Sequence, residues 1–146
     1  MTRETIYAAL FALISGKAPF ITTSRVLKHW NDVGPEEMPA LFQVQKTEEK
    51  KQQRGTPAIW TLRTDLYLYV HTNAQQLGGS ITASQLLNPL LDAVTGAFAI
   101  DDLSNNVCTL GGMVSHAWID GAIETSEGQL GDHEIAIVPV AVLVPD

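Results

Sequence analysis

The segment from Ala58 to Val70 places the strongest limit on the fold, because apolar residues occupy almost every second position along these thirteen residues. The positions between them are mixed, from Ile59 and Arg63 to Tyr69. Alternation with a period of two predicts a β-strand that turns one face to the core. At ~3.3 Å per residue this strand is roughly 43 Å long, whereas strands usually contain about five or six residues. We therefore expect a second chain to lie beside it.

The rest of the chain alternates between helical and extended patterns, separated by Gly, Pro and polar clusters. In chain order these patterns predict a helix over 3–15, a short strand over 20–23, a loop over 29–39, a strand over 40–46, a polar arm over 47–56, a loop over 73–80, a helix over 83–98, a polar loop over 101–106, and a hairpin with strands over 113–124 and 134–144. Pro89 predicts that the second helix starts near Asn88 or is kinked. This order predicts one α+β domain over residues 1–146, with two helices packed on one face of a mainly antiparallel sheet with long hairpins.

The last predicted strand, over 134–144, is apolar at both sets of alternate positions, which indicates burial of both faces. Pro139 cannot donate a hydrogen bond to a neighbouring strand, so its position requires a sheet edge or a bulge. An apolar strand at the edge of a sheet promotes aggregation unless a partner covers it. We therefore expect a further molecule to cover this strand.

Charge is divided unequally between the two halves of the chain. The formal charge is −7, but residues 1–72 hold all nine basic side chains and seven acidic ones, whereas residues 73–146 hold nine acidic side chains and no Lys or Arg. Binding of nucleic acid through the second half is disfavoured, because phosphate contacts need cations. The division is consistent with drift in surface composition, with a head-to-tail oligomer in which one half meets the other, or with an acidic surface that does not bind DNA.

The composition also limits the cellular context. Cys108 is the one cysteine, which excludes an internal disulfide framework and a zinc site built from several cysteines. No apolar run approaches the ~20 residues of a membrane span, and the first residues lack the apolar core of a signal peptide. We therefore expect a globular protein of a reducing compartment with no membrane partner.

A metal site is the first chemical possibility. His116 and Asp120 share one face of a predicted strand, and His133 could approach them from the returning strand. A metal site needs three or four convergent ligands, and the chain contains no HxH or HExxH pattern. Ordinary strand histidines are therefore the simpler interpretation, and we expect no metal.

Three further features could carry chemistry but fit structural roles better. Cys108 with a histidine could form a nucleophile pair, although a buried structural cysteine is commoner. Gly111-Gly112 belongs to no phosphate-binding pattern and would let the chain enter the hairpin with unusual backbone dihedrals. Asp101-Asp102 lacks the spacing and the final Glu of a calcium loop. The sequence therefore predicts neither an enzyme nor a cofactor.

Aromatic and arginine side chains suggest a contact surface instead. Tyr67 and Tyr69 share the mixed face of the long strand with Arg63, and Trp118 lies with polar residues on the strand over 113–124. Exposed Tyr, Trp and Arg are enriched at the centres of protein interfaces. The alternative is that the two helices cover these faces.

Several segments together resemble a known family of phage proteins. They are Ser24-Arg25, His29-Trp30-Asn31-Asp32-Val33, Pro39-Ala40-Leu41-Phe42, Leu110-Gly111-Gly112-Met113-Val114-Ser115-His116, Ile119-Asp120-Gly121, Gly128-Gln129-Leu130-Gly131 and Ala136-Ile137-Val138-Pro139-Val140. In their order and in the length of the chain they resemble the tail-terminator (tail-completion, minor tail protein U-like) family of long-tailed bacteriophages and prophages. The resemblance covers nearly the whole chain.

The resemblance implies an α+β subunit of a homohexameric ring, a structural protein without catalytic residues. Such a ring caps the growing tail tube, ends its polymerisation and offers its other face for joining to the head. The implied partners are further copies of the chain, the tail-tube protein and the head–tail connector or neck protein, while double-stranded DNA passes through without specific binding. The implied location is the neck end of the virion tail, after assembly in the host cytoplasm. The alternatives are another neck or head–tail joining protein, or a small metal-dependent hydrolase or binding module.

Two groups of residues are predicted to serve this assembly. The candidates for contacts between subunits or with the tube are Glu48, Glu49, Lys50, Lys51, Arg54, Arg25, Arg63, Tyr67, Tyr69 and Trp118. The acidic candidates for the wall of the channel are Asp101, Asp102, Asp120, Glu124, Glu127 and Asp132. An acidic wall would let DNA pass, because phosphates find no cations to bind there. The polar arm over 47–56 would become ordered on the tube or on a neighbouring subunit.

Overall fold

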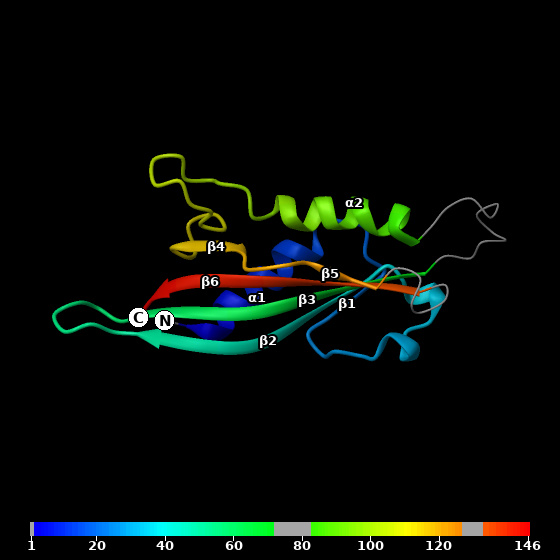
Figure 1. Ribbon diagram of the computed structural model, residues 1–146, viewed down its shortest axis with the longest axis horizontal. Coiled ribbons are helices and arrows are strands. Elements are labelled where there is room, and N and C mark those ends of the chain that lie inside the picture. The colour runs from blue at the N-terminus through cyan, green and yellow to red at the C-terminus, as the bar shows by residue number, and fades with distance from the viewer. Residues whose placement is uncertain (1, 72–82, 127–132) are drawn as a thin grey trace.

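The computed structural model describes residues 2–71, 83–126 and 133–146 (Figure 1). The elements in these ranges are α1 (Arg3–Ser15), β1 (Thr22–Ser24), the 3₁₀ helices η1 (Trp30–Asp32) and η2 (Pro35–Glu37), β2 (Ala40–Lys51), β3 (Ile59–His71), α2 (Ala83–Gly96), β4 (His116–Ile119), β5 (Glu124–Thr125) and β6 (His133–Pro145). The predicted α+β class is confirmed, since the described residues form two α-helices and a mainly antiparallel sheet of six strands.

The long strand predicted from the alternation is β3, and it lies in the middle of the sheet. The strand order is β1-β2-β3-β6-β4, with β5 also paired to β6, and of the described pairs only β1 with β2 is parallel. β3 pairs with β6 along its whole length, from Ile59 opposite Pro145 to His71 opposite His133. The expectation of a second chain beside β3 is wrong, because β2 and β6 occupy both of its edges.

The first half of the polar arm predicted over 47–56 is part of the sheet. β2 continues through a register shift between Gln45 and Glu48 and pairs with β3 as far as Lys51, opposite Ile59. Backbone hydrogen bonds do not depend on side-chain polarity, so the long β3 extends the ladder into a segment without apolar residues. The strand predicted to end at residue 46 therefore runs to Lys51, and only the turn beyond it projects from the sheet.

The strand predicted over 113–124 is much shorter than expected. Within this segment only β4 and β5 pair with β6, and residues 120–123 interrupt the ladder opposite Pro139. Asp120 N–H donates to the carbonyl oxygen of Pro139 at 2.9 Å, so this side of Pro139 faces the interruption. In an antiparallel ladder the N–H and C=O of one residue point to the same neighbour, so the missing N–H of Pro139 costs no bond to β3. β6 is therefore an interior strand, and the expectation that another molecule must cover its edge is wrong.

Both helices pack on one face of the sheet and share its main core. The core combines Ile6, Tyr7, Leu10 and Ile14 of α1 and Leu87, Leu90 and Val94 of α2 with alternate residues of β3 and β6. α2 begins at Ala83 and continues through Pro89, so the expected start near Asn88 is wrong. Burial of three apolar side chains from this helix offsets the missing hydrogen bond. In the described ranges, neither helix is long and apolar enough to cross a membrane.

The second face of the sheet is covered at one end only. Residues 26–38, which we call the cover segment, fold over this end and include both 3₁₀ helices (Figure 1). A second buried cluster there consists of Val33, Met38, Ala40, Phe42 and Tyr69, with Trp30, Tyr67 and Ile135 packed against it. At the other end of the strands, none of the segments that the structure describes covers this face.

Candidate assembly surface

The uncovered end of the second face contains a groove beside the β2–β3 hairpin. The groove has a volume of about 580 Å³ and is lined by Lys51, Gln53, Thr56, Pro57, Ile59, Thr61, Leu143 and Pro145. We call it the hairpin groove. Its apolar side chains come from positions on the face of β3 and β6 that turns away from the helices, and Ile59 is 43% exposed. Apolar side chains gathered on one exposed face are typical of an interaction surface.

Two basic candidates of the hairpin lie at or near this groove, and Glu49 lies on the same face opposite Thr61. Lys51 lines the groove, and Arg54 lies in the exposed turn beyond it. Neither forms an ion pair with the residues that the structure describes, whereas Lys50 Nζ lies 3.3 Å from Asp146 Oδ2. Lys51 and Arg54 can therefore meet an acidic partner without first giving up an ion pair with a described residue.

Farther along the same face, the candidates Glu49, Arg63, Asp120 and Trp118 lie together. The guanidinium of Arg63 reaches Glu49 at 3.6 Å and Asp120 at 3.2 Å, and the indole N–H of Trp118 donates to Asp120 at 3.4 Å. The Trp118 ring also stacks on His116, with centroids 4.9 Å apart. The three charged side chains are at least 38% exposed, so each pair is worth only about 0–1 kcal/mol. These pairs can exchange for contacts with another molecule at little cost.

Tyr69 lies in the buried cluster under the cover segment, so the expectation that it is exposed is wrong. Only 3% of Tyr69 is exposed, and its hydroxyl donates to the carbonyl oxygen of Lys28 at 2.6 Å. Burial raises the pKa of Tyr69 to about 12. Tyr67 is half-buried against the same cluster. The alternation correctly placed both side chains on the second face, but the cover segment rather than a helix buries them.

Glu48 and Arg25 already have partners inside the chain. Glu48 accepts hydrogen bonds from the Tyr7 hydroxyl at 3.0 Å and from Arg3 Nε at 2.7 Å, on the helix face of the sheet. Burial, together with the nearby carboxylate of Glu48, raises the pKa of Tyr7 to about 12. Arg25 pairs with Glu4 at 2.5 Å beside β1. These two candidates therefore stabilise the junction between α1 and the sheet.

Asp101 and Asp102 belong to an ordered loop over 100–113, which we call the acidic loop. Asp101 accepts from Thr109 N–H at 2.6 Å and from Gly111 N–H at 2.9 Å, and these bonds hold its pKa below the usual value. Gly111 has a φ of 79°, as expected for a glycine that allows an unusual backbone conformation. Asp102 accepts from the backbone and side chain of Asn105. Donors within the loop therefore supply hydrogen bonds to both carboxylates, as expected for a loop that is not a calcium site.

The acidic loop contains an apolar residue that the sequence analysis treated as part of a polar loop. Leu103 is 87% exposed, and Ile100 and Met113 in the same loop are 45% and 42% exposed. A leucine directly after two aspartates was the available signal. Of the other acidic candidates, Glu124 is exposed on β5, and Glu127 and Asp132 lie outside the described residues.

Acidification should loosen the acidic loop through Asp101. Because its pKa is lowered in the folded state, the carboxylate contributes stability above the ordinary value near ~3.9, and this contribution is lost as the pH falls through the lower folded value. Asp101→Asn should speed hydrogen exchange of the Thr109 and Gly111 amides at neutral pH, measured by NMR. Asp102→Asn is the control and should leave these two amides unchanged. Equal exchange in both variants would contradict the role of Asp101.

The structure does not bring His116, Asp120 and His133 together. His116 is paired with Leu143, ten residues along β6 from His133, which corresponds to ~33 Å. His133 instead contacts the ring of His71, with centroids 4.7 Å apart, at the covered end of the sheet. Among the described residues, no three His, Cys, Asp or Glu side chains are placed to hold a metal ion. The hypothesis of a metal site on these three residues is therefore wrong.

Cys108 is placed as a structural residue. Its side chain is buried, and burial raises the pKa of its thiol. His116 Nδ1 accepts the backbone N–H of Cys108 at 3.1 Å, while the thiol lies 3.8 Å from the carbonyl oxygen of Ala97. A raised thiol pKa opposes formation of the nucleophilic thiolate.

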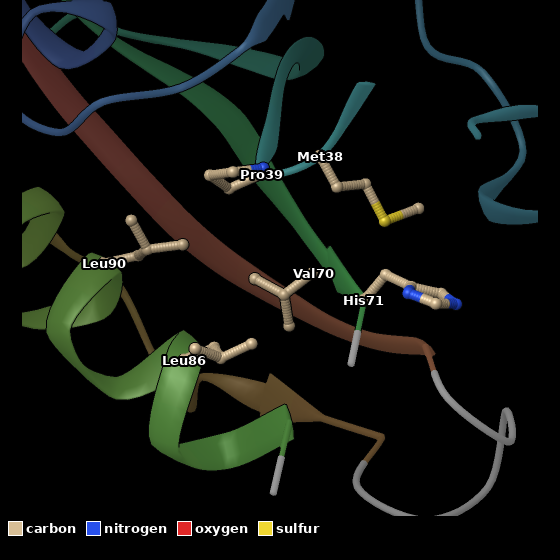
Figure 2. A pocket seen from close by; sticks show the side chains of 6 residues that line it. All are labelled: Met38, Pro39, Val70, His71, Leu86 and Leu90. Carbon is tan, nitrogen blue, oxygen red and sulfur yellow. The ribbon is translucent and has the colours of Figure 1, made fainter. Parts of the chain in front are cut away.

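A smaller cavity lies between α2 and the end of β3. It has a volume of about 150 Å³ and is lined by Met38, Pro39, Val70, His71, Leu86 and Leu90. Figure 2 shows Leu86 and Leu90 on the helix beside Val70, with Met38 and His71 at the other side. His71 is the one polar side chain in this lining. Binding sites for small molecules combine an apolar cavity with several convergent polar groups, so we assign no ligand here.

One buried acidic residue had no place in the sequence analysis. Glu134 is 1% exposed, and the hydroxyl of Ser84, in the first turn of α2, donates to both of its carboxylate oxygens at 3.2 Å. An acidic residue at the start of an otherwise apolar strand was the signal available. The contact attaches the start of α2 to β6.

The chain shows little similarity to known proteins. No family model matches the chain, and no curated protein matches it. Among solved structures, one match is a chain of the virion of a native gene transfer agent particle, with 15% sequence identity and a TM-score of 0.44, covering 95% of this chain and 86% of that chain. A TM-score below 0.5 carries no argument about function, so the function is argued from the residues.

Proposed function

We propose that this protein is a structural tail protein of a phage-like particle, a tail terminator that forms a hexameric ring on the end of the tail tube. The observation that carries the proposal is the uncovered end of the second sheet face. There the hairpin groove and the exposed ion pairs of Arg63 lie side by side on the same face of the sheet. The resemblance of the chain to tail terminators supports the particular role.

The uncovered face has the properties of a surface that becomes buried on assembly. One face of an antiparallel sheet can be solvated, but it is then normally polar. Here the half-buried Leu143 and the exposed Ile59 line a groove on it. The weak ion pairs beside the groove can rearrange when a partner arrives.

The charge division supports identical subunits that meet through different surfaces. A head-to-tail contact joins one patch to a second, different patch, and a closed set of such contacts is a ring. The exposed Lys51 and Arg54 belong to the first half of the chain, and the acidic loop belongs to the second. A ring whose remaining acidic residues face the channel would let DNA pass without binding it.

Assembly with the tail tube tests this function directly. We expect the purified protein to form sixfold rings in negative-stain images, either alone or on tubes of the tail-tube protein encoded in the same genome. Tails assembled without it should have variable and increased lengths. Monomers in both preparations, together with tails of unchanged length, would contradict the proposal.

A further inference from the structure

The hairpin groove and the acidic loop complement each other in charge and polarity. We propose that, in the ring, the acidic loop of one subunit docks into the hairpin groove of the next subunit. The occupant of the groove is thus a second copy of this chain. This inference rests on the ring of the proposed function and adds the contact that builds it.

The groove supplies apolar walls and positive charge. Pro57, Ile59, Leu143 and Pro145 provide the apolar part of the lining, and Lys51 is its one charged residue. Arg54 adds a second cation in the neighbouring turn. A segment that fits this site carries apolar side chains flanked by carboxylates.

The acidic loop has that composition. Leu103 is 87% exposed and directly follows Asp101 and Asp102, while Ile100 precedes them and is 45% exposed. The bonds from Asp101 to Thr109 and Gly111, and the bridge between Asp102 and Val107, hold the loop in one conformation. A loop that is ordered before binding loses less conformational entropy on docking.

The positions of the two surfaces favour a contact between copies. The loop lies beside the outer edge of β4, where the carbonyl oxygen of Cys108 accepts the N–H of Ala117 at 2.8 Å. The groove lies on the face of β3 and β6. In Figure 1 the loop and the hairpin lie toward the same end of the long axis, the loop next to β4 and the hairpin at the end of β2 and β3. Rotation about an axis along that direction would bring the loop of one copy toward the groove of the next.

Two single variants test the contact, because each damages one of its two surfaces. Lys51→Glu reverses the charge of the groove, and Leu103→Lys places a cation at the most exposed apolar position of the loop. Both side chains are exposed, so both variants should fold, as checked by circular dichroism. We expect each to raise the concentration needed for half-maximal ring formation about ten-fold or more. Val26→Asp is the control, because Val26 is 74% exposed next to β1, the edge strand opposite β4, and it should assemble as the wild type does.

Mixing the two variants gives the sharper result. Lys51→Glu retains an intact loop and Leu103→Lys retains an intact groove, so the mixture should form one good contact and yield heterodimers. Native mass spectrometry should show heterodimers in the mixture, whereas each variant by itself should show only monomers at the same concentration. Normal rings from either variant alone, or a mixture without heterodimers, would overturn the proposed contact while leaving the ring itself in place. A wild-type protein that forms no ring, alone or with tube, would instead overturn the proposed function together with the contact.

Discussion

Phe42→Ala is expected to lower the free energy of unfolding by about 3–5 kcal/mol. Phe42 has no exposed surface and lies on the second face of the sheet, with its ring centroid 5.1 Å from that of Tyr69. Val33 and Met38 of the cover segment belong to the same cluster. Removing the ring leaves a cavity that these neighbours cannot fill without moving the backbone of β2 or of the cover segment.

Urea denaturation followed by circular dichroism measures this loss. Phe11→Ala is the matched control, because Phe11 is only half-buried on α1 and its removal should cost clearly less. The loss for Phe42 would be a large share of the ~5–15 kcal/mol that stabilises an ordinary domain. Equal losses in the two variants would show that the cover segment does not depend on this cluster.

Glu134→Ala should lower the free energy of unfolding by at least about 1–3 kcal/mol, because it leaves the Ser84 hydroxyl without its acceptor. Glu134 is buried, and its two contacts with Ser84 join the first turn of α2 to β6. Ser84→Ala removes the same contacts from the other side and should also destabilise the protein. The carboxylate thus acts as an attachment point for α2.

The control for Glu134 is another glutamate next to the same strand. Glu124 lies exposed on β5, which pairs with β6, so Glu124→Ala should change the free energy of unfolding by no more than about 0.5 kcal/mol. Thermal denaturation of the three variants measures the difference. A Glu134→Ala variant as stable as Glu124→Ala would show that the buried carboxylate contributes nothing to the attachment of α2.

Local periodicity predicted those helices and strands whose position follows from the pattern of their own side chains. The alternation from Ala58 to Val70 located β3 to within one residue at each end, and the helical spacing located α1. The two-sided apolar pattern over 134–144 located β6, but not its place in the sheet, because we expected an edge strand with both faces buried, whereas β6 is interior and its second face is mostly half-buried. In each case side chains of one short segment determine which face is buried, so the pattern can be read from that segment alone.

Pairing between strands determined where the strands that the sequence analysis misplaced begin and end. β2 extends to Lys51 because β3 offers backbone hydrogen bonds to it, which no property of the polar residues predicts. The strand predicted over 113–124 breaks where it meets Pro139, a residue of another strand. Tyr69 is buried because the cover segment crosses it, from about forty residues earlier in the chain.

The sequence by itself determined the α+β class, the long strand β3 and the division of charge along the chain. Only the tertiary structure decided where exposed apolar residues gather. The hairpin groove joins residues of the β2–β3 hairpin to the last residues of β6, and Leu103 became notable only once its exposure was known. The physical reason is that a fold is encoded largely in local periodicity, whereas a surface is formed by segments that become neighbours only when the sheet closes.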